Sequence, residues 1–197
     1  MQTETSRIEA FSDGMFAIAI TLLILEVKVP APQAGGLAGA LLRQWPSYLA
    51  FLLSFLYIGV MWMNHHRMFT HIRRSNDTLL LLNLLLLLGV TAVPFPTAVL
   101  ASSLGTPDQR TAALFYNGVF IVIAIFFNVL WRYALSRRLV DERLADSAAM
   151  ISRHYAAGPL MYVLCLVLAW VDVRVSLGVN VALAIFFALP PSLMKRS

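Results

Sequence analysis

Long blocks of apolar residues, separated by short polar segments, run along almost the whole chain of 197 residues. A helix of about 20 mostly apolar residues is long enough to cross the hydrocarbon core of a bilayer. Six blocks approach or reach this length. The pattern therefore predicts an all-α, polytopic membrane protein in which residues 1–197 form a single domain of six transmembrane helices. The predicted spans are residues 7–29, 46–69, 78–100, 106–138, 151–171 and 174–189.

Local signals set the expected ends of these helices. Pro30 ends the first span, because proline has no backbone N–H and clashes with the preceding turn. Pro94 is expected to kink or end the third span. Thr106 as N-cap, proline at the first helical position and Gln109 at the third are a typical helix start. The last two spans are short and joined by a turn near Asp172, and residues 33–39 are expected to be a flexible linker.

Composition excludes a water-soluble domain. Hydrophobic residues make up 59% of the chain and charged residues only 13%, and the mean hydropathy is +0.76. Soluble domains are about a quarter charged. A cleaved signal peptide is not expected, because Glu4, Glu9 and Asp13 replace the basic segment that such a peptide requires. Cys165 is the only cysteine, so no disulfide within one chain is possible and a small buried side chain is expected.

The basic residues indicate an orientation. The net charge is +5, and eleven of the fifteen Lys and Arg residues fall on the side that carries both predicted termini. The other four, on the opposite side, are Lys28, Arg43, Arg110 and Arg174. Lys and Arg concentrate in cytoplasmic loops, so we expect both termini in the cytoplasm. The positive charge is thus a topology signal, and no nucleic-acid partner is predicted.

Two polar clusters lie where the apolar pattern predicts membrane. One begins the first span and the other lies near the end of the second, so both fall on the cytoplasmic side. Their members are Arg7, Ser12 and Asp13 in the first cluster and Trp62, Asn64, His65 and His66 in the second. Intramembrane polar groups are costly and are candidates for function. We hypothesise a hydrogen-bond network that holds the first helix against the second; solvated side chains at the membrane interface are the alternative.

Catalysis and metal binding find little support in the sequence. Adjacent residues on a helix point about 100° apart, so His65 and His66 cannot easily bind one ion. Their spacing also matches no zinc signature. Only Asp13 with these two histidines offers groups for an enzyme, and no catalytic motif is present. We therefore expect neither catalytic residues nor a metal.

The first span carries an aliphatic stripe. Ile18, Leu22 and Leu25 are spaced i, i+4 and i+7 and fall within a narrow sector of a helix, with Thr21 beside them. By periodicity alone such a stripe is an ordinary seam for packing against another helix.

The segment RIEAFSDG followed by MFAIAITLLILEVKVP resembles the Arg-x-x-x-Phe-Ser-Asp signature of the transmembrane protein 175 family. This family comprises lysosomal potassium channels and their prokaryotic relatives. The resemblance rests on Arg7, Phe11, Ser12 and Asp13, and residues 62–65 resemble the family's second-helix motif.

The resemblance implies a homotetramer with the first helix of each copy around a central pore. The carbonyl filter of ordinary potassium channels is absent from this family. Instead, rings of Ile18, Leu22 and Leu25 would narrow the pore, and Thr21 would influence selectivity. The residues that would hold the pore helix in place are Arg7, Ser12, Asp13, Trp62, Asn64, His65 and His66.

The expected function is therefore a potassium-preferring cation channel in a prokaryotic plasma membrane. Its partners would be the lipid bilayer, further copies of the chain and permeant K⁺, with no cofactor. A secondary transporter or proton-coupled carrier is the alternative, and such proteins usually show repeats and polar groups at mid-bilayer. Glu26, directly after Leu25, would form a ring of carboxylates that attracts cations, or else pair with Lys28 or be solvated.

Overall fold

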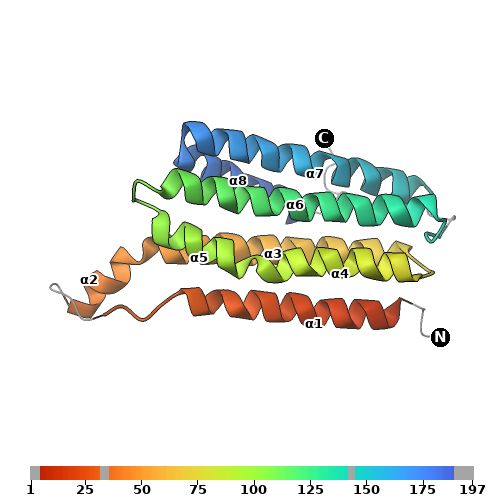
Figure 1. Cartoon of the computed structure of the whole chain (residues 1–197), viewed down its shortest axis with the longest axis horizontal. Coiled ribbons are helices and arrows are strands. Elements are labelled where there is room, and N and C mark those ends of the chain that lie inside the picture. The colour runs from red at the N-terminus through yellow and green to blue at the C-terminus, as the bar shows by residue number, and fades with distance from the viewer. Residues whose placement is uncertain (1–4, 32–35, 142–144, 189–197) are drawn as a thin grey trace.

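The computed structural model describes residues 5–31, 36–141 and 145–188. These residues form a bundle of helices with short connections (Figure 1). The elements are α1 (Ser6–Leu22), the 3₁₀ helix η1 (Leu23–Glu26), α2 (Gly36–Arg43), α3 (Trp45–His71), α4 (Asp77–Ala92), α5 (Pro94–Ser103), α6 (Gln109–Ser136), α7 (Ala145–Val171) and α8 (Val173–Ala188). The predicted all-α class is confirmed.

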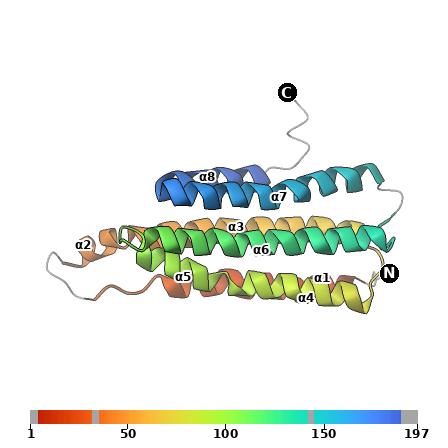
Figure 2. The same cartoon turned by 45° about the horizontal axis from the view of Figure 1, so that its top comes forward.

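The helices lie in three layers (Figure 2). α3 and α6 occupy the middle layer, with α7 and α8 on one side and α1, α4 and α5 on the other. The three largest fully buried side chains, Trp131, Tyr57 and Tyr116, belong to the middle layer. α1 therefore lies at the edge of the bundle and packs on one side only, against α3 and α4.

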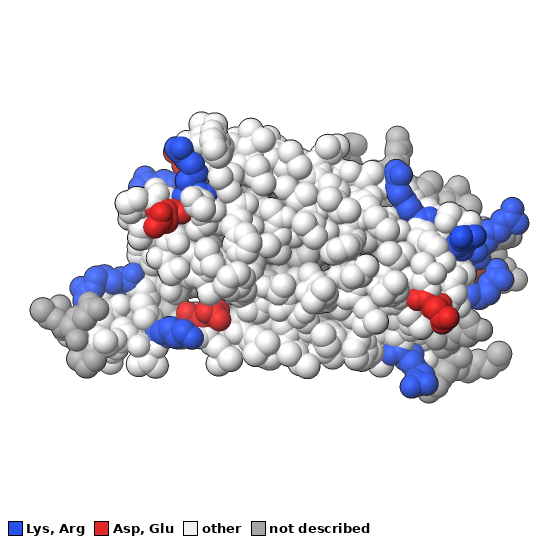
Figure 3. Space-filling view, in the orientation of Figure 1, with Lys and Arg blue, Asp and Glu red and all other residues white. Residues whose placement is uncertain are grey.

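Within the described ranges, the middle of the visible face of the molecule carries no charged side chains (Figure 3). Lys, Arg, Asp and Glu gather at its two ends (Figure 3). Among the residues that the structure describes, four helical segments are long and apolar enough to cross a membrane, and shorter apolar helices cover Tyr155–Val171 and Val173–Phe187. The four long segments are Ser6–Glu26, Trp45–His71, Asp77–Ser103 and Gln109–Ser136. The chain is thus a multi-pass membrane protein, and the six predicted spans correspond in order to α1 with η1, α3, α4 with α5, α6, α7 and α8.

Two predicted features of the connections differ in detail. The third span is interrupted at Val93 and continues as α5 from Pro94, so the proline bends the span without ending it. Part of the predicted linker is helical, since α2 begins at Gly36 and turns the buried Ala40 toward the bundle. The rest of that linker, residues 33–35, lies outside the described residues.

The fourth predicted span begins later than expected, because the N-cap of α6 is Asp108 and not Thr106, and the Asp108 side chain makes no capping hydrogen bond. The Thr106 hydroxyl accepts a hydrogen bond from the backbone N–H of Asp108 at 3.2 Å, just before α6. One Asp172 carboxylate oxygen accepts from the N–H groups of Arg174 at 2.7 Å and Val175 at 3.3 Å. The turn predicted near Asp172 is therefore the N-cap of α8.

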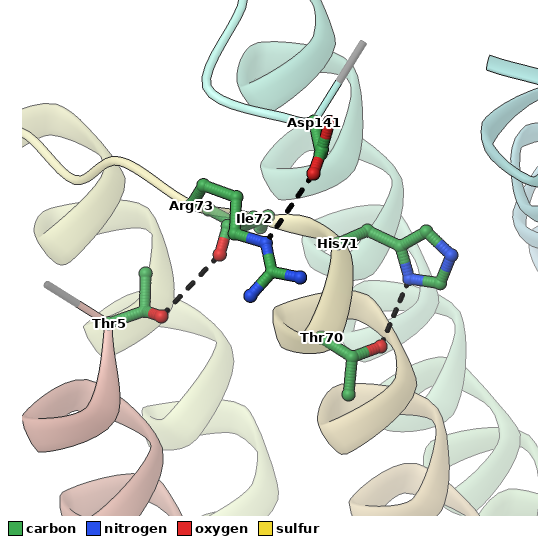
Figure 4. A network of polar contacts seen from close by, with 6 residues as sticks. All are labelled: Thr5, Thr70, His71, Ile72, Arg73 and Asp141. Carbon is green, nitrogen blue, oxygen red and sulfur yellow. Dashed lines mark hydrogen bonds and ion pairs between the residues drawn. The ribbon is translucent and has the colours of Figure 1, made fainter. Parts of the chain in front are cut away.

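At the end of the bundle that carries the N-terminus, two loops are joined (Figure 4). Ile72, after α3, and Val140, after α6, form an isolated antiparallel bridge. The Arg73 Nε lies 3.8 Å from a carboxylate oxygen of Asp141. The Thr5 hydroxyl donates to the carbonyl of Ile72 at 3.4 Å. The beginning of α1 is thereby fixed to the same two loops.

Candidate functional site

α1 has two chemically different faces. One face is buried against the same chain, and its residues follow each other at intervals of three or four. These buried residues are Ile8, Ser12, Phe16, Ala19 and, in η1, Leu23. The opposite face is exposed and carries the aliphatic stripe. The structure thus separates the residues that fix this helix from those that it presents to its surroundings.

A buried hydrogen-bond chain links α1, α4 and α3. The Asn83 amide nitrogen donates to the Ser12 hydroxyl at 3.0 Å, and Ser12 donates to the carbonyl of Ile8 at 2.8 Å. The Asn83 oxygen lies 2.9 Å from the Nε2 of His65. Because an amide oxygen only accepts, His65 is the donor in this contact. Ser12, Asn83 and His65 are each at most 2% exposed.

Aromatic rings pack against the His65 side of this chain of hydrogen bonds. The His65 ring stacks on Phe69 with centroids 4.5 Å apart, and it lies 5.4 Å from the ring of Phe16. These contacts exclude competing polar groups and fix the rotation of the imidazole. α1 is therefore held at one depth and one rotation by both hydrogen bonds and close packing.

A second contact joins α1 to α3 on the surface of the chain. The indole nitrogen of Trp62 donates to a carboxylate oxygen of Asp13 at 2.8 Å. Trp62 is 43% exposed, and its ring lies over that of His66 at 6.4 Å. Asp13 thus finds the donor that its position before an apolar run requires.

Two residues expected in the network lie elsewhere. The Asn64 carbonyl accepts a hydrogen bond from the Tyr155 hydroxyl at 2.9 Å, and Asn64 lines a cavity of about 50 Å³ between α3, α6, α7 and α8. It points about 100° away from His65 around α3, and hence away from α1. Arg7 is exposed and makes no hydrogen bond or ion pair with any residue that the structure describes.

Asn83 belongs to this chain of hydrogen bonds but was not predicted from the sequence. All the other residues from position 79 to position 88, in the third predicted span, are leucines. A lone amide in such a run requires partners inside the protein, so the signal was present. Its partners could not be named without knowing which side of α4 faces α1.

The aliphatic stripe points away from the chain's own core. Ile18 is 53% exposed, Leu22 40% and Leu25 59%. Thr21 is also exposed, and its hydroxyl donates to the carbonyl of Ile18 at 2.9 Å. Leu25 lies in the 3₁₀ segment, which advances about 120° per residue, so it comes nearly into line with Leu22. The stripe is therefore straighter at this end than a continuous α-helix would make it.

Of the alternatives for Glu26, pairing with Lys28 is not found in the described part of the chain. Glu26 is half-buried and ends η1. The Lys28 ammonium donates instead to the carbonyl of Leu25 at 2.6 Å. Arg73 and Asp141 form the one ion pair among the residues that the structure describes. Over the same residues, no group of three or more His, Cys, Asp or Glu side chains lies close enough to hold a metal ion.

Comparisons with known proteins identify the family. The family model described as endosomal/lysosomal potassium channel TMEM175 matches residues 7–94. A potassium channel of Chamaesiphon minutus is 50% identical over 193 residues, which is 95% of each chain. A potassium channel of Streptomyces collinus is 47% identical over 189 residues, 93% of this chain and 91% of the relative.

A solved structure extends the likeness to the fold. It is the crystal structure of a lysosomal potassium-selective channel TMEM175 homolog from Chamaesiphon minutus. It matches all of both chains with a TM-score of 0.87 and 48% identity. The resemblance predicted from the Arg7 to Asp13 motif is confirmed, and the chain belongs to the TMEM175 family.

Proposed function

We propose that this chain is the subunit of a potassium-preferring cation channel in a prokaryotic plasma membrane. Four copies surround a central pore, and α1 of each copy lines it. Each copy crosses the membrane six times and has both termini in the cytoplasm. Two relatives that are about half identical are named potassium channels, and a homolog with the same fold is described as potassium-selective, which supports the assignment.

The two-faced structure of α1 is the observation that carries the proposal. A pore-lining helix needs one face anchored in its own subunit and another turned outward. Ser12 anchors the first face through Asn83, and Ile18 with Leu25 occupies the second. With α1 at the edge of the bundle (Figure 2), its outward face is available to line a central axis between copies.

Rings of aliphatic side chains suit a pore without a carbonyl filter. A narrow apolar ring dewets when closed, and when open it disfavours ions that keep their hydration shell. Potassium sheds water more readily than sodium. The Thr21 hydrogen is directed to the Ile18 carbonyl, so the hydroxyl oxygen keeps lone pairs for a partly dehydrated cation.

Helix lengths and the distribution of charge support six crossings and cytoplasmic termini. α7 has 27 residues and α8 has 16, and α8 is thus about 24 Å long. An even number of crossings places both termini on the side of the loops that carry Arg73, Arg74, Arg137 and Arg138. That distribution is the one expected of cytoplasmic loops.

Flux measurements test this function. Purified wild type, Ile18→Asn and Leu22→Ala are reconstituted into liposomes, and K⁺ and Na⁺ fluxes are compared. We expect Ile18→Asn to reduce the preference for K⁺, because polar side chains let Na⁺ pass with its water. Leu22→Ala should raise the flux of both ions by widening the pore. Native mass spectrometry of the same preparations should give four copies per complex.

A matched substitution outside the proposed pore serves as control. Leu164 on α7 is 52% exposed, close to the value for Ile18, so Leu164→Asn places the same side chain on another outward face. Its flux and selectivity should equal those of wild type. Unchanged selectivity and flux in both α1 variants would show that the stripe only packs against neighbouring helices.

A further inference from the structure

A polar pocket of about 610 Å³ lies at the end of the bundle opposite the N-terminus. It is formed where α6 begins and where α7 turns into α8 (Figure 1). Its polar lining includes Gln109, Arg110, Thr111, Asp172 and Arg174. None of these residues belongs to α1 or to its hydrogen-bond chain, so the proposed pore does not explain the pocket.

Two guanidinium groups face this pocket without an acidic partner. Neither Arg110 nor Arg174 forms an ion pair with any residue in the described ranges. The Arg110 guanidinium lies over the ring of Trp170, 5.9 Å from its centroid. A cation–π contact of this kind restrains the guanidinium group, and its N–H groups still have hydrogen bonds to offer. Arg110 is therefore positioned to donate to a ligand.

The carboxylate in the pocket wall is already engaged. One Asp172 oxygen accepts from the backbone N–H groups of Arg174 and Val175, which begin α8. This bond directs the carboxylate at its own helix. The remaining lining groups, the Gln109 amide and the Thr111 hydroxyl, can also donate. Taken together, the pocket suits an anion whose oxygens accept several hydrogen bonds, and phosphate is such an anion.

The surroundings of the pocket favour a lipid as the carrier of that phosphate. Trp170 is 63% exposed and Val171 is 76% exposed, directly beside the charged groups. Exposed tryptophan is typical of the membrane interface, at the level of the lipid headgroups. On the visible face, Lys and Arg side chains lie at the two ends of the molecule, outside its uncharged middle (Figure 3). A soluble anion would leave this apolar rim unused, whereas a phospholipid would cover it.

We propose that this pocket binds the phosphate of an anionic phospholipid in the leaflet at this end of the bundle. Arg110 and Arg174 bind the phosphate, and Trp170 with Val171 contacts the glycerol and the first part of the acyl chains. The site lies on the α6–α8 side of each copy and is independent of ion conduction.

Native mass spectrometry of the full-length protein in detergent tests the proposal. The probes are phosphatidylglycerol, phosphatidylcholine and inorganic phosphate. Wild type should retain phosphatidylglycerol in preference to phosphatidylcholine, whose choline masks the phosphate. The double variant Arg110→Gln/Arg174→Gln should bind phosphatidylglycerol about tenfold more weakly, because charge-assisted hydrogen bonds are lost. Trp170→Ala should weaken binding by about threefold through the lost stacking.

The double variant Lys28→Gln/Arg43→Gln is the matched control. It removes two positive charges from the same end of the helix bundle but leaves the pocket unchanged. This variant should therefore bind phosphatidylglycerol like wild type. Equal weakening in both double variants would overturn the proposal in favour of general charge attraction. Unchanged binding in Arg110→Gln/Arg174→Gln would also overturn it. If only the binding of inorganic phosphate depends on the two arginines, the site takes a soluble anion and the lipid assignment is wrong.

Discussion

Asn83 makes two hydrogen bonds of opposite sense in a part of the chain that water does not reach. Its nitrogen donates to Ser12 and its oxygen accepts from His65. An apolar side chain can replace neither function. Hydrocarbon offers no substitute partner, so loss of the amide leaves the buried Nε2–H of His65 without its acceptor and the buried Ser12 hydroxyl without its donor.

We therefore predict that Asn83→Leu lowers the stability of the folded protein by about 1–3 kcal/mol, the cost of unsatisfied buried groups. Thermal unfolding of the purified protein in detergent measures the effect. Thr91→Val on the same helix is the control, because the Thr91 hydroxyl only donates to the carbonyl of Leu88 in its own helix. Equal melting temperatures for the two variants would argue against a structural role of the chain of hydrogen bonds.

At the scale of residues, the sequence predicted the depth of the polar side chains along the helices better than the side of the helix on which each one lies. Ser12, Asp13, Trp62 and His65 were expected at one level, and the structure brings each of them into the contacts between α1 and its neighbours. Asn64 was expected there too, yet it faces α7. Adjacent helical residues share a depth but differ by about 100° in direction, and only packing decides which of them faces α1.

α8 is a short helix that polar contacts attach to the bundle. The Asn180 amide nitrogen donates to the Asn117 oxygen at 3.1 Å, and the Asn180 oxygen accepts from the Tyr57 hydroxyl at 2.8 Å. The Ser176 hydroxyl donates to the carbonyl of Cys165 at 2.7 Å. All these residues are fully buried. Asn180 thus connects α8 to both helices of the middle layer.

We predict that Asn180→Leu loosens α8 and exposes the thiol of Cys165. The chain has one cysteine, so its reaction with a maleimide reports this region alone. Wild type should react slowly because Cys165 is fully buried, and the variant should react at least several-fold faster. Val175→Leu, at an exposed position of the same helix, should react like wild type. Identical rates in all three proteins would show that the attachment of α8 does not depend on Asn180.

Helix limits were predictable where local chemistry sets them. Asp172 provides the side-chain acceptor at the start of α8, and Pro94 interrupts the third span where a missing N–H requires it. Thr106 accepts a hydrogen bond only in the turn before α6, whose N-cap is Asp108. The change from α to 3₁₀ geometry after Leu22 has no such local signal, because residues 23–25 are ordinary aliphatic residues. This change depends on how η1 packs against α3 and α5.

At the scale of the whole molecule, hydrogen bonds attach the beginning of α1 to the loop after α3 and to α4. Thr5 bonds to the loop after α3, and Ser12 bonds to Asn83. Beyond the aliphatic stripe, Glu26 ends η1 and lies at the opposite end of the bundle. In the proposed tetramer, four copies of Glu26 would therefore surround the outer mouth of the pore, where their charge acts on ions before they enter.

This arrangement makes K⁺ conductance dependent on Glu26 at low salt. Charges act over about 30 Å at 0.01 M salt but only about 3 Å at 1 M, because counter-ions screen them. Glu26→Gln should thus lower single-channel conductance by about twofold or more at 10 mM K⁺ and leave it nearly unchanged at 1 M, since the carboxylates concentrate cations only when screening is weak. Asp108→Asn, at the same end but before α6, should have no effect at either concentration. A reduction of equal size at both concentrations would instead indicate a change in the shape of the pore, and no reduction at either would mean that Glu26 is merely solvated.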